Sequence, residues 1–269
     1  MDLQIDHEVA VVIGGAKGIG RAIGKAFLRE HASVVFADVD PIVTETAKEA
    51  GDQAGGRADG VVLDATDFSA VQALAEAVVS KHGHCHHVVF AAGAGSGKHG
   101  FPFWNLTPAD WERVLRVNLI GAVNAAHAFA PQLVSQRQGT MLFLSSIAGQ
   151  IGSQTDPPYS AAKAGVINFA QCAAKDLAEY NVRVNTICPG MVKTAVNQAV
   201  WRAWYEQQPA DDQTPYDQWA DSKIKKVAPL GRWQTVADIA ELAVFLASPR
   251  AHNITGQTLN VDGGQVMHS

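Results

Sequence analysis

The amino-acid sequence predicts an α/β fold, a single doubly wound parallel sheet with helices on both faces. Short runs rich in Val, Ile and Leu alternate with helix-length segments from residue 8 to residue 262, which is typical of such a sheet. The 269-residue chain is 47% hydrophobic, and a chain of this size buries roughly three quarters of its unfolded surface. Because no linker, repeat or low-complexity tract interrupts the alternation, we expect one domain over residues 1–269.

The first predicted unit is a strand, a glycine-rich turn and a helix. Residues 9–13 form an unbroken apolar run, and residues 14–20 follow with the glycine spacing G-x-x-x-G-x-G. An apolar stripe at helical spacing comes next, formed by Ile19, Ile23, Ala26 and Phe27. The glycines permit torsions closed to other residues, and the first N–H groups of a helix attract a pyrophosphate. Alone the motif also fits an ordinary turn, but between a strand and a helix it predicts dinucleotide binding.

The second predicted strand, residues 33–37, ends in Asp38, eighteen residues after the last glycine of the loop. An acidic residue at about this distance accepts hydrogen bonds from an adenosine ribose. The alternative role is a helix cap, but Asp40 followed by Pro41 already satisfies the capping pattern. We therefore expect Asp38 to be free for the ribose.

A hydroxyl, a phenol and an ammonium are predicted to meet at one site. Ser146 follows the apolar run 141–144, Tyr159 stands thirteen residues later, and Lys163 comes four residues after the tyrosine. Residues 159–180 are Ala-rich, lack proline and carry apolar residues at helical spacing, so Tyr159 and Lys163 share a helix face. The hydroxyl of a free tyrosine has a pKa of about 10, and a nearby ammonium lowers that pKa because it favours the charged phenolate. The spacing alone also fits a solvated helix face, so the other motifs decide.

Together these motifs make the chain similar to the short-chain dehydrogenase/reductase family over essentially its whole length. The glycine loop resembles that family's T-G-x-x-x-G-x-G, with Ile13 where threonine is usual. The resemblance implies a Rossmann-type sheet of seven strands and a catalytic tetrad of Asn118, Ser146, Tyr159 and Lys163, with Asn118 in the predicted helix 111–130. It also implies that Tyr159 exchanges a proton with a substrate oxygen that Ser146 polarises, while Asn118 holds a water.

The resemblance further implies which residues contact the cofactor. Asp64, after the predicted strand 61–63, matches an adenine contact, and the P-G-x-V-x-T stretch that begins at Pro189 matches the segment that holds the nicotinamide amide. The predicted set is Gly14, Lys17, Gly18, Ile19, Gly20, Asp38, Asp64, Ala92, Gly93, Tyr159, Lys163, Pro189, Gly190, Val192 and Thr194. One departure is that Phe-Ala-Ala-Gly at residues 90–93 replaces the family's N-N-A-G. Because the missing amides are mainly structural in the family, the replacement leaves open which hydrogen bonds hold the central sheet at this point.

Two residues favour different cofactors. Lys17 stands where relatives that use NADP often place a basic residue, whereas Asp38 would repel a 2′-phosphate. Repulsion of a dianion by a carboxylate amounts to several kcal/mol at an effective dielectric of about 20, and Lys17 can itself pair with Asp38. We therefore predict NAD as the cofactor.

Two stretches are expected to shape the substrate pocket: the loop 94–104, and a lid at about residues 195–228. The lid contains Trp201, Trp204, Tyr205, Tyr216 and Trp219, which either contact substrate or pack the lid against the body. Polar candidates for substrate binding are Lys98, His99, Gln150 and Gln154, each of which also fits a solvated side chain. These polar side chains favour a small polyol, sugar acid or hydroxy acid as the substrate.

Composition and the N-terminal sequence argue against several classes of binding partner and against secretion. A formal charge of −5 without Lys or Arg clusters argues against nucleic acid and anionic membranes. The polar N-terminus enters the first strand directly, which predicts neither a signal peptide nor a spanning segment. Cys85, Cys172 and Cys188 are predicted to be reduced core thiols of a cytoplasmic protein. The histidine-rich run 82–87 precedes a strand at residues 88–91, on the face opposite the site, so we expect no metal.

Three functions fit these observations. The first is an NAD-dependent alcohol dehydrogenase or ketone reductase, the second an NADPH-dependent 3-oxoacyl-thioester reductase, and the third a non-enzymatic dinucleotide sensor. The resemblance implies a homotetramer formed through long helices. Apolar candidates for that contact are Ala122, Ala125, Ala126, Phe129, Ala130, Phe169, Ala173 and Leu177, for which the alternative is burial against the protein's own sheet, and the tail 267–269 is expected to reach a neighbour.

Overall fold

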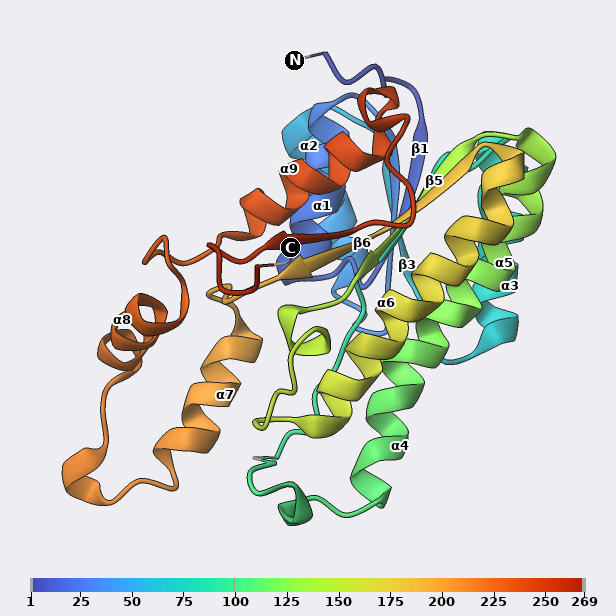
Figure 1. Ribbon diagram of the computed structural model, residues 1–269. Helices are drawn as coiled ribbons and strands as arrows, with labels where there is room; N and C mark the ends of the chain where they lie inside the picture. The colour runs from blue at the N-terminus through green and yellow to red at the C-terminus, as the bar shows by residue number, and fades with distance from the viewer. Residues whose placement is uncertain (1, 99, 268–269) are drawn as a thin grey trace.

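The computed structural model describes residues 2–98 and 100–267. Its strands form one seven-stranded parallel sheet in the order β3-β2-β1-β4-β5-β6-β7 (Figure 1), which confirms the predicted fold class. The order reverses between β1 and β4, and ligands of open α/β sheets bind beyond the carboxyl ends of the strands at such a point. The strands are β1 (Val9–Ile13), β2 (Ser33–Asp38), β3 (Ala58–Val62), β4 (His87–Phe90), β5 (Gly139–Leu144), β6 (Val182–Pro189) and β7 (Thr258–Val261).

Helices cover both faces of the sheet (Figure 1). One face carries α1 (Gly18–Arg29), α2 (Val43–Ala54) and α9 (Val236–Ala247), and the other carries α3 (Phe68–His82), α5 (Gly121–Gln136) and α6 (Pro157–Leu177). Side chains of β1 alternate between the two cores, because Val11 packs on the α3, α5 and α6 side whereas Val12 packs on the α1, α2 and α9 side. A strand buried on both faces is a continuous apolar run, which explains why β1 was predictable.

Four predicted elements have different boundaries in the structure. β3 begins at Ala58 rather than at residue 61, and β4 is His87–Phe90 rather than 88–91. The predicted helix 111–130 consists of α4 (Ala109–Leu115), a π-helix (Arg116–Ile120) and the first part of α5. The predicted helix 159–180 is α6 followed by a short 3-10 helix (Ala178–Tyr180).

The early start of β3 has a packing reason. Its sequence Ala-Asp-Gly-Val-Val lacks the apolar run by which strands are predicted. A Cβ built on Gly60 would lie 2.5 Å from the Cα of Thr44, so the missing side chain lets α2 lie directly on the strand. The weak apolar signal therefore comes from a close helix contact.

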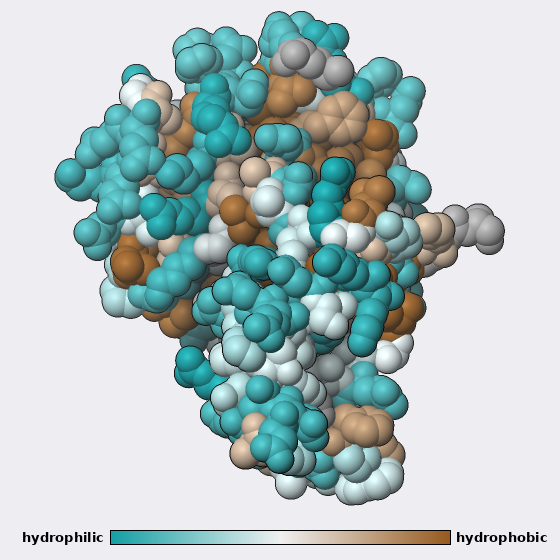
Figure 2. Space-filling view, turned by 90° about the vertical axis from the view of Figure 1, so that its left-hand side faces the viewer, coloured by the Kyte–Doolittle hydropathy of each residue, from teal (hydrophilic) through white to brown (hydrophobic). Residues whose placement is uncertain are grey.

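The remaining helices follow β6 or connect other elements. α7 (Ala195–Tyr205) and α8 (Tyr216–Val227) stand apart from the sheet (Figure 1). The lower part of the molecule in Figure 2 mixes hydrophilic residues with residues of intermediate hydropathy. No helix within residues 2–98 and 100–267 is long and apolar enough to cross a membrane. Short 3-10 helices occupy Phe103–Asn105, Ile147–Gly149, Ala210–Asp212 and Pro249–Ala251.

Candidate active site

The glycine loop between β1 and α1 is built for a close approach. A Cβ on Gly14 would collide with the backbone of Ala92, and one on Gly20 would collide with the carbonyl of Gly14. Gly18 has a φ of +57°, and a Cβ built on it would have no neighbouring atom within 4 Å. The loop is therefore open at Gly18. Lys17 forms the N-cap of α1 without a side-chain cap, and the first turn carries no acidic residue. The exposed amides of α1 therefore fit the pyrophosphate of a dinucleotide.

Asp38 lies at the end of β2 and is not free, contrary to the sequence prediction. Its two carboxylate oxygens accept hydrogen bonds from the backbone N–H groups of Ala16 and Asp40, each at 3.0 Å. The carboxylate thus ties the glycine loop to the start of α2. Each oxygen has a further lone pair, so ribose hydroxyls can still donate to it.

Lys17 pairs with Asp40 rather than with Asp38. Its Nζ lies 2.6 Å from Oδ2 of Asp40, and this hydrogen bond and charge raise the pKa of Lys17 while lowering the pKa of Asp40. The other oxygen of Asp40 accepts the N–H of Ile42, next to the first residue of α2. Asp40 therefore holds the lysine, but the prediction that it caps the helix is wrong, because Ile42 is the N-cap of α2 and no side chain caps it.

Other predicted cofactor contacts surround the same crevice. Asp64, exposed just beyond the end of β3, accepts the N–H of Thr66 at 2.8 Å. Gly190 approaches β7 so closely that a Cβ would lie 2.7 Å from the Cα of Asp262. The Thr194 hydroxyl accepts the N–H of Asn197 at 3.4 Å and so caps α7. These positions lie after β3 and β6, at the carboxyl edge of the sheet.

The segment after β4 is held without the missing amide side chains. The N–H of Ala91 donates to the carbonyl of Ile13 at 2.7 Å, and Asn118 Nδ2 donates to the carbonyl of Ala94 at 2.7 Å. Main-chain bonds and Asn118 therefore do what the family's extra amides were expected to do. The question raised by the Phe-Ala-Ala-Gly sequence is answered by these contacts.

Ser146, Tyr159 and Lys163 meet as predicted. The Tyr159 hydroxyl is hydrogen-bonded to the Ser146 side chain, whose Oγ also accepts the N–H of Ala148 at 3.1 Å. Lys163 Nζ lies 5.6 Å from the centre of the Tyr159 ring and donates to the Leu144 carbonyl at 2.7 Å. β5 therefore positions the serine and the lysine, while α6 carries the phenol and the ammonium one turn apart.

Burial dominates the titration of this cluster. It raises the pKa of Tyr159 to about 12, despite the hydrogen bond from Ser146, and it lowers the pKa of Lys163 to about 8. The phenolate was predicted from two charges, the Lys163 ammonium and an oxidised nicotinamide, and Lys163 by itself does not offset the burial of the phenol. The phenol is a proton donor until a further positive charge lies beside it.

Asn118 occupies the π-helix between α4 and α5. Its Nδ2 donates to the carbonyls of Ala94 and Val114, and its Oδ1 is buried without a partner in the part of the chain that is described. A Cβ on Gly93 would lie 2.9 Å from that oxygen and 3.3 Å from Lys163 Nζ. A buried acceptor without a donor is costly, so this oxygen fits a water or a cofactor hydroxyl.

The polar candidates for substrate binding have protein partners. Lys98 Nζ lies 2.6 Å from Asp110, and Gln150 exchanges two hydrogen bonds with Asn260 at 2.6 and 3.0 Å. Gln154 is exposed, and His99 lies outside the described residues. The prediction that Lys98 and Gln150 face the substrate is therefore not supported by their contacts.

The lid aromatics divide into two groups. Trp201 donates to the carbonyl of Thr214 and packs on Tyr205 and Tyr216, at 5.0 and 5.7 Å between ring centres. These rings hold α7 and α8 together. Trp204 and Trp219, 6.0 Å apart, instead line a cavity of about 430 Å³ together with Lys223 and Lys226. Sequence reasoning missed both lysines, although their three-residue spacing on a helix was the available signal.

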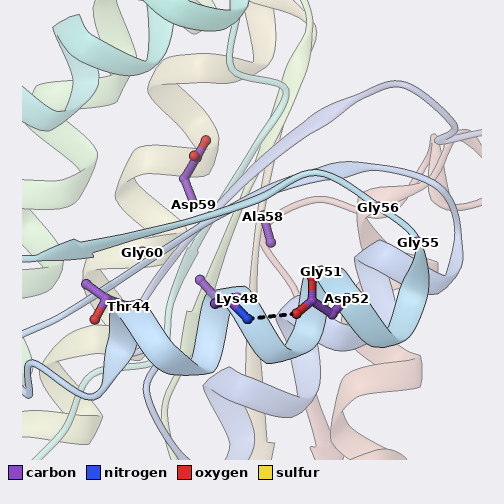
Figure 3. A pocket seen from close by; sticks show the side chains of 10 residues that line it. Thr44, Lys48, Gly51, Asp52, Gly55, Gly56, Ala58, Asp59 and Gly60 are labelled. Carbon is purple, nitrogen blue, oxygen red and sulfur yellow. Dashed lines mark hydrogen bonds and ion pairs between the residues drawn. The ribbon is translucent and has the colours of Figure 1, made fainter.

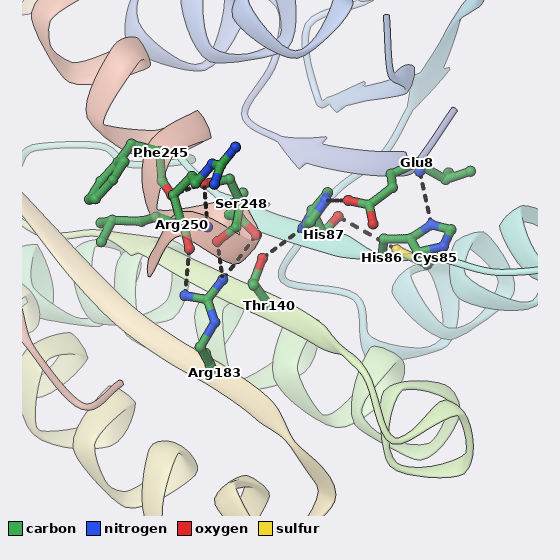
Figure 4. A network of polar contacts seen from close by, with 12 residues as sticks. Glu8, Cys85, His86, His87, Thr140, Arg183, Phe245, Ser248 and Arg250 are labelled. Carbon is green, nitrogen blue, oxygen red and sulfur yellow. Dashed lines mark hydrogen bonds and ion pairs between the residues drawn. The ribbon is translucent and has the colours of Figure 1, made fainter. Parts of the chain in front are cut away.

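The opposite end of the sheet holds the histidine-rich run. His87 Nε2 lies 2.6 Å from Glu8, and its Nδ1 lies 2.9 Å from the Thr140 hydroxyl (Figure 4). No group of three or more His, Cys, Asp or Glu side chains among residues 2–98 and 100–267 could hold a metal ion. Cys85 and Cys188 are buried as predicted, and burial raises the pKa of their thiols to about 12 and about 11, but Cys172 is exposed.

A second hollow, of about 620 Å³, lies between α2 and β3 (Figure 3). Its walls include the ion pair of Lys48 with Asp52 at 3.1 Å and the glycines 51, 55, 56 and 60. None of the predicted catalytic side chains lines it. It is therefore separate from the crevice between β1 and β4.

Comparisons with known proteins agree with this geometry. The family described as enoyl-(acyl carrier protein) reductase matches residues 14–266. An acetoacetyl-CoA reductase of Synechocystis sp. is 34% identical over 264 residues, which cover 98% of each chain. Galactitol 2-dehydrogenase of Agrobacterium fabrum is 32% identical over 98% of this chain and 100% of its own. The crystal structure of L-sorbose reductase from Gluconobacter frateurii, complexed with NADPH and L-sorbose, is 27% identical, covers 100% of each chain and gives a TM-score of 0.90.

Proposed function

Since the chain belongs to the short-chain dehydrogenase/reductase family, oxidoreductases of alcohols and ketones that use a nicotinamide dinucleotide, we propose that it transfers hydride between NAD and a small polar secondary alcohol or ketone. The observation that carries this proposal is the contact between the Ser146 and Tyr159 hydroxyls, with the buried Lys163 ammonium beside the ring. It lies at the carboxyl edge of the sheet, as does the glycine loop.

Each residue of the tetrad has a distinct role. Ser146 binds the substrate oxygen and orients it toward the Tyr159 hydroxyl. Tyr159 donates its proton to that oxygen in reduction and takes it back in oxidation. Lys163 holds a positive charge near the phenol, and Asn118 Oδ1 accepts a hydrogen bond from a water that returns the proton to solvent. A bound nicotinamide supplies or accepts the hydride and, when oxidised, brings the further positive charge that favours the phenolate.

The preference for NAD rests on Asp38 and on the position of Lys17. A 2′-phosphate beside the Asp38 carboxylate would meet like charge, and Lys17 is already paired with Asp40 at 2.6 Å. We expect NAD to exceed NADP by roughly a hundredfold in kcat/KM, which corresponds to about 2.7 kcal/mol. The related sorbose reductase was crystallised with NADPH, so equal efficiency with both cofactors would overturn this preference.

The similar proteins differ in the substrates that their names state. The names galactitol 2-dehydrogenase and L-sorbose reductase favour a polyol or sugar. The acetoacetyl-CoA reductase, 34% identical, supports the second candidate, an NADPH-dependent reductase of 3-oxoacyl thioesters. A non-enzymatic dinucleotide sensor would have no use for an assembled tetrad.

A substrate panel separates these functions. Purified protein is mixed with NAD or NADP and secondary alcohols, and with NADH or NADPH and ketones, sugar acids and 3-oxoacyl thioesters, while absorbance of the reduced nicotinamide is recorded. We expect turnover of polar alcohols or ketones with NAD or NADH. Turnover confined to 3-oxoacyl thioesters with NADPH would establish the second function. Cofactor binding without any turnover would establish the sensor.

The remaining parts of the proposal concern organisation. We propose that residues 1–269 form one domain, that residues 195–228 act as the substrate lid, and that the enzyme is a cytoplasmic homotetramer. Support for the lid comes from its place after β6 and from the cavity between its helices.

A further inference from the structure

The cavity in the lid combines two aromatic walls with two cations. Trp204 of α7 and Trp219 of α8 face each other, and Lys223 Nζ lies 4.5 Å from the centre of the Trp219 ring. Lys226, one turn further along α8, lines the same space. A volume of about 430 Å³ is within the range of small-ligand sites.

The two lysines that line the cavity lack the carboxylate partner that several nearby cations have. Arg202 and Lys225 of the lid also form no ion pair within the described residues, but neither lines the cavity. Lys17 is paired with Asp40, Lys98 with Asp110, and Lys193 lies 3.8 Å from Asp217. Neither Lys223 nor Lys226 forms an ion pair with any carboxylate of the described chain. The counter-charge at the cavity must therefore come from solvent or from a ligand.

Of the two lysines, Lys223 has the greater need for a hydrogen-bond acceptor. It is half-buried, and the Trp219 ring attracts its charge but leaves the three N–H donors of the ammonium without an oxygen acceptor. Burial also lowers the pKa of Lys223. An anion in the cavity would accept hydrogen bonds from these donors and favour the charged form.

The cavity borders the chain segment that leads to the proposed catalytic tyrosine. Thr155 lines it, and the next residue, Asp156, caps α6 by accepting the N–H of Tyr159 at 3.4 Å. The same Asp156 carboxylate accepts the N–H of Ser96 at 2.7 Å from the loop after β4. Asp156 therefore joins the wall of the cavity to the start of the helix that carries Tyr159.

We propose that Lys223 and Lys226 bind the anionic group of the substrate, a carboxylate, sulfonate or phosphate separated by a spacer from the carbinol or carbonyl carbon. This inference rests on the proposed function and narrows its substrate class from polar to anionic. The spacer lies along the cavity wall that Trp204 and Trp219 form, and the two ammonium groups hold the charge.

The test compares matched ketones. Methyl ketones with a terminal carboxylate on polymethylene spacers of increasing length, and the methyl esters of the same acids, are assayed with NADH and NADPH. At the best spacer length we expect the acid to exceed its ester by about tenfold or more in kcat/KM. Lys223→Gln and Lys226→Gln should each remove most of that preference. Lys225→Gln, which changes an exposed lysine of α8 outside the cavity, should keep it.

A binding measurement keeps the two proposals distinguishable. The same keto acids are titrated against tryptophan emission, with thermal melting used to show that each variant is folded. Quenching that saturates in the wild type and in Lys225→Gln, but is lost in Lys223→Gln, supports the site even if no ketone is reduced. In that case only the proposed reaction fails. Acids and esters reduced equally, absent quenching in the wild type, or equal losses in all three variants would overturn the anion site.

Discussion

At the scale of single residues, Tyr159 carries the sharpest prediction. Tyr159→Phe should abolish turnover and leave cofactor binding nearly unchanged, because the phenol is not needed to hold adenine or pyrophosphate. Steady-state rates and cofactor fluorescence measure the two effects separately. Tyr180→Phe removes a phenol at the end of the helical segment, outside the site, and should retain full activity. A Tyr159→Phe enzyme with more than about a hundredth of wild-type turnover would contradict the acid/base role.

A second residue-scale prediction concerns Asp38, Asp40 and Lys17. Asp38→Ala should narrow or invert the NAD preference, and it should weaken both cofactors because the Ala16 and Asp40 amides lose their acceptor. Adding Asp40→Ala releases the Lys17 ammonium and should move the kcat/KM ratio further toward NADP. The ratio of the two cofactors is the measurement. An unchanged ratio in both variants would show that other residues choose the cofactor.

Residue identities were predictable from the sequence, whereas their partners were not. Ser146, Tyr159 and Lys163 lie within one strand-loop-helix unit, so their spacing together with the other motifs was enough to predict that they meet. The Lys98 pair with Asp110 and the Gln150 pair with Asn260 depend on how loops fold across the site. The second of these pairs joins residues 110 positions apart in the chain. Local periodicity contains no information about such contacts.

At the scale of elements, Asn118 shows how a helix irregularity serves a site. An uninterrupted helix was predicted over 111–130, but the turn Arg116–Ile120 is a π-helix, which inserts an extra residue and is frequent at functional sites. Both the composition and the spacing of this segment fit an ordinary helix. The π-turn therefore arises from tertiary contacts, including the two carbonyls bound by Asn118.

The junction of β1, β4 and β5 yields a prediction about pH. Burial raises the pKa of Glu8, but the hydrogen bond and charge of His87 outweigh it, so the pKa lies below the ordinary 4.5. A carboxyl with a lowered folded-state pKa stabilises the protein above pH 4.5, and this contribution is lost as pH falls through the folded value.

Glu8→Gln tests that contribution. At pH 7 the variant should lose about 2 kcal/mol of unfolding free energy, because a part-buried charged hydrogen bond is replaced. Below pH 4.5 the difference from wild type should shrink. Denaturant unfolding across this range measures it, with Glu76→Gln on the exposed side of α3 as control. A difference that stays constant with pH would rule out the ionised pair as its source.

At the scale of the whole molecule, the helix faces expected to join subunits are largely used inside the protomer. Ala122, Ala125, Phe129 and Leu177 are buried in the core between the sheet and its helices. Ala126 and Ala173 are buried there too, and Ala130 and Phe169 pack against the same core. That part of the assembly prediction is wrong, because an amphipathic helix uses its apolar stripe against its own sheet first. Of the tail, His268 and Ser269 lie outside the described residues.

The outer face of α6 still offers a close-packing surface. Ala161 and Ala164 are exposed, Gly165 is half-buried, and Ile120, the last residue of the π-helix before α5, is 44% exposed. Small residues at three- and four-residue spacing let two helices approach closely across a two-fold axis. We therefore still expect a symmetric tetramer that uses this face, and light scattering at working concentration should give the mass of four chains. Ala164→Arg should dissociate the assembly, whereas Ala77→Arg, at an exposed alanine of α3, should not. A monomeric mass for the unmodified protein would refute the tetramer, and equal behaviour of the two arginine variants would refute the choice of face.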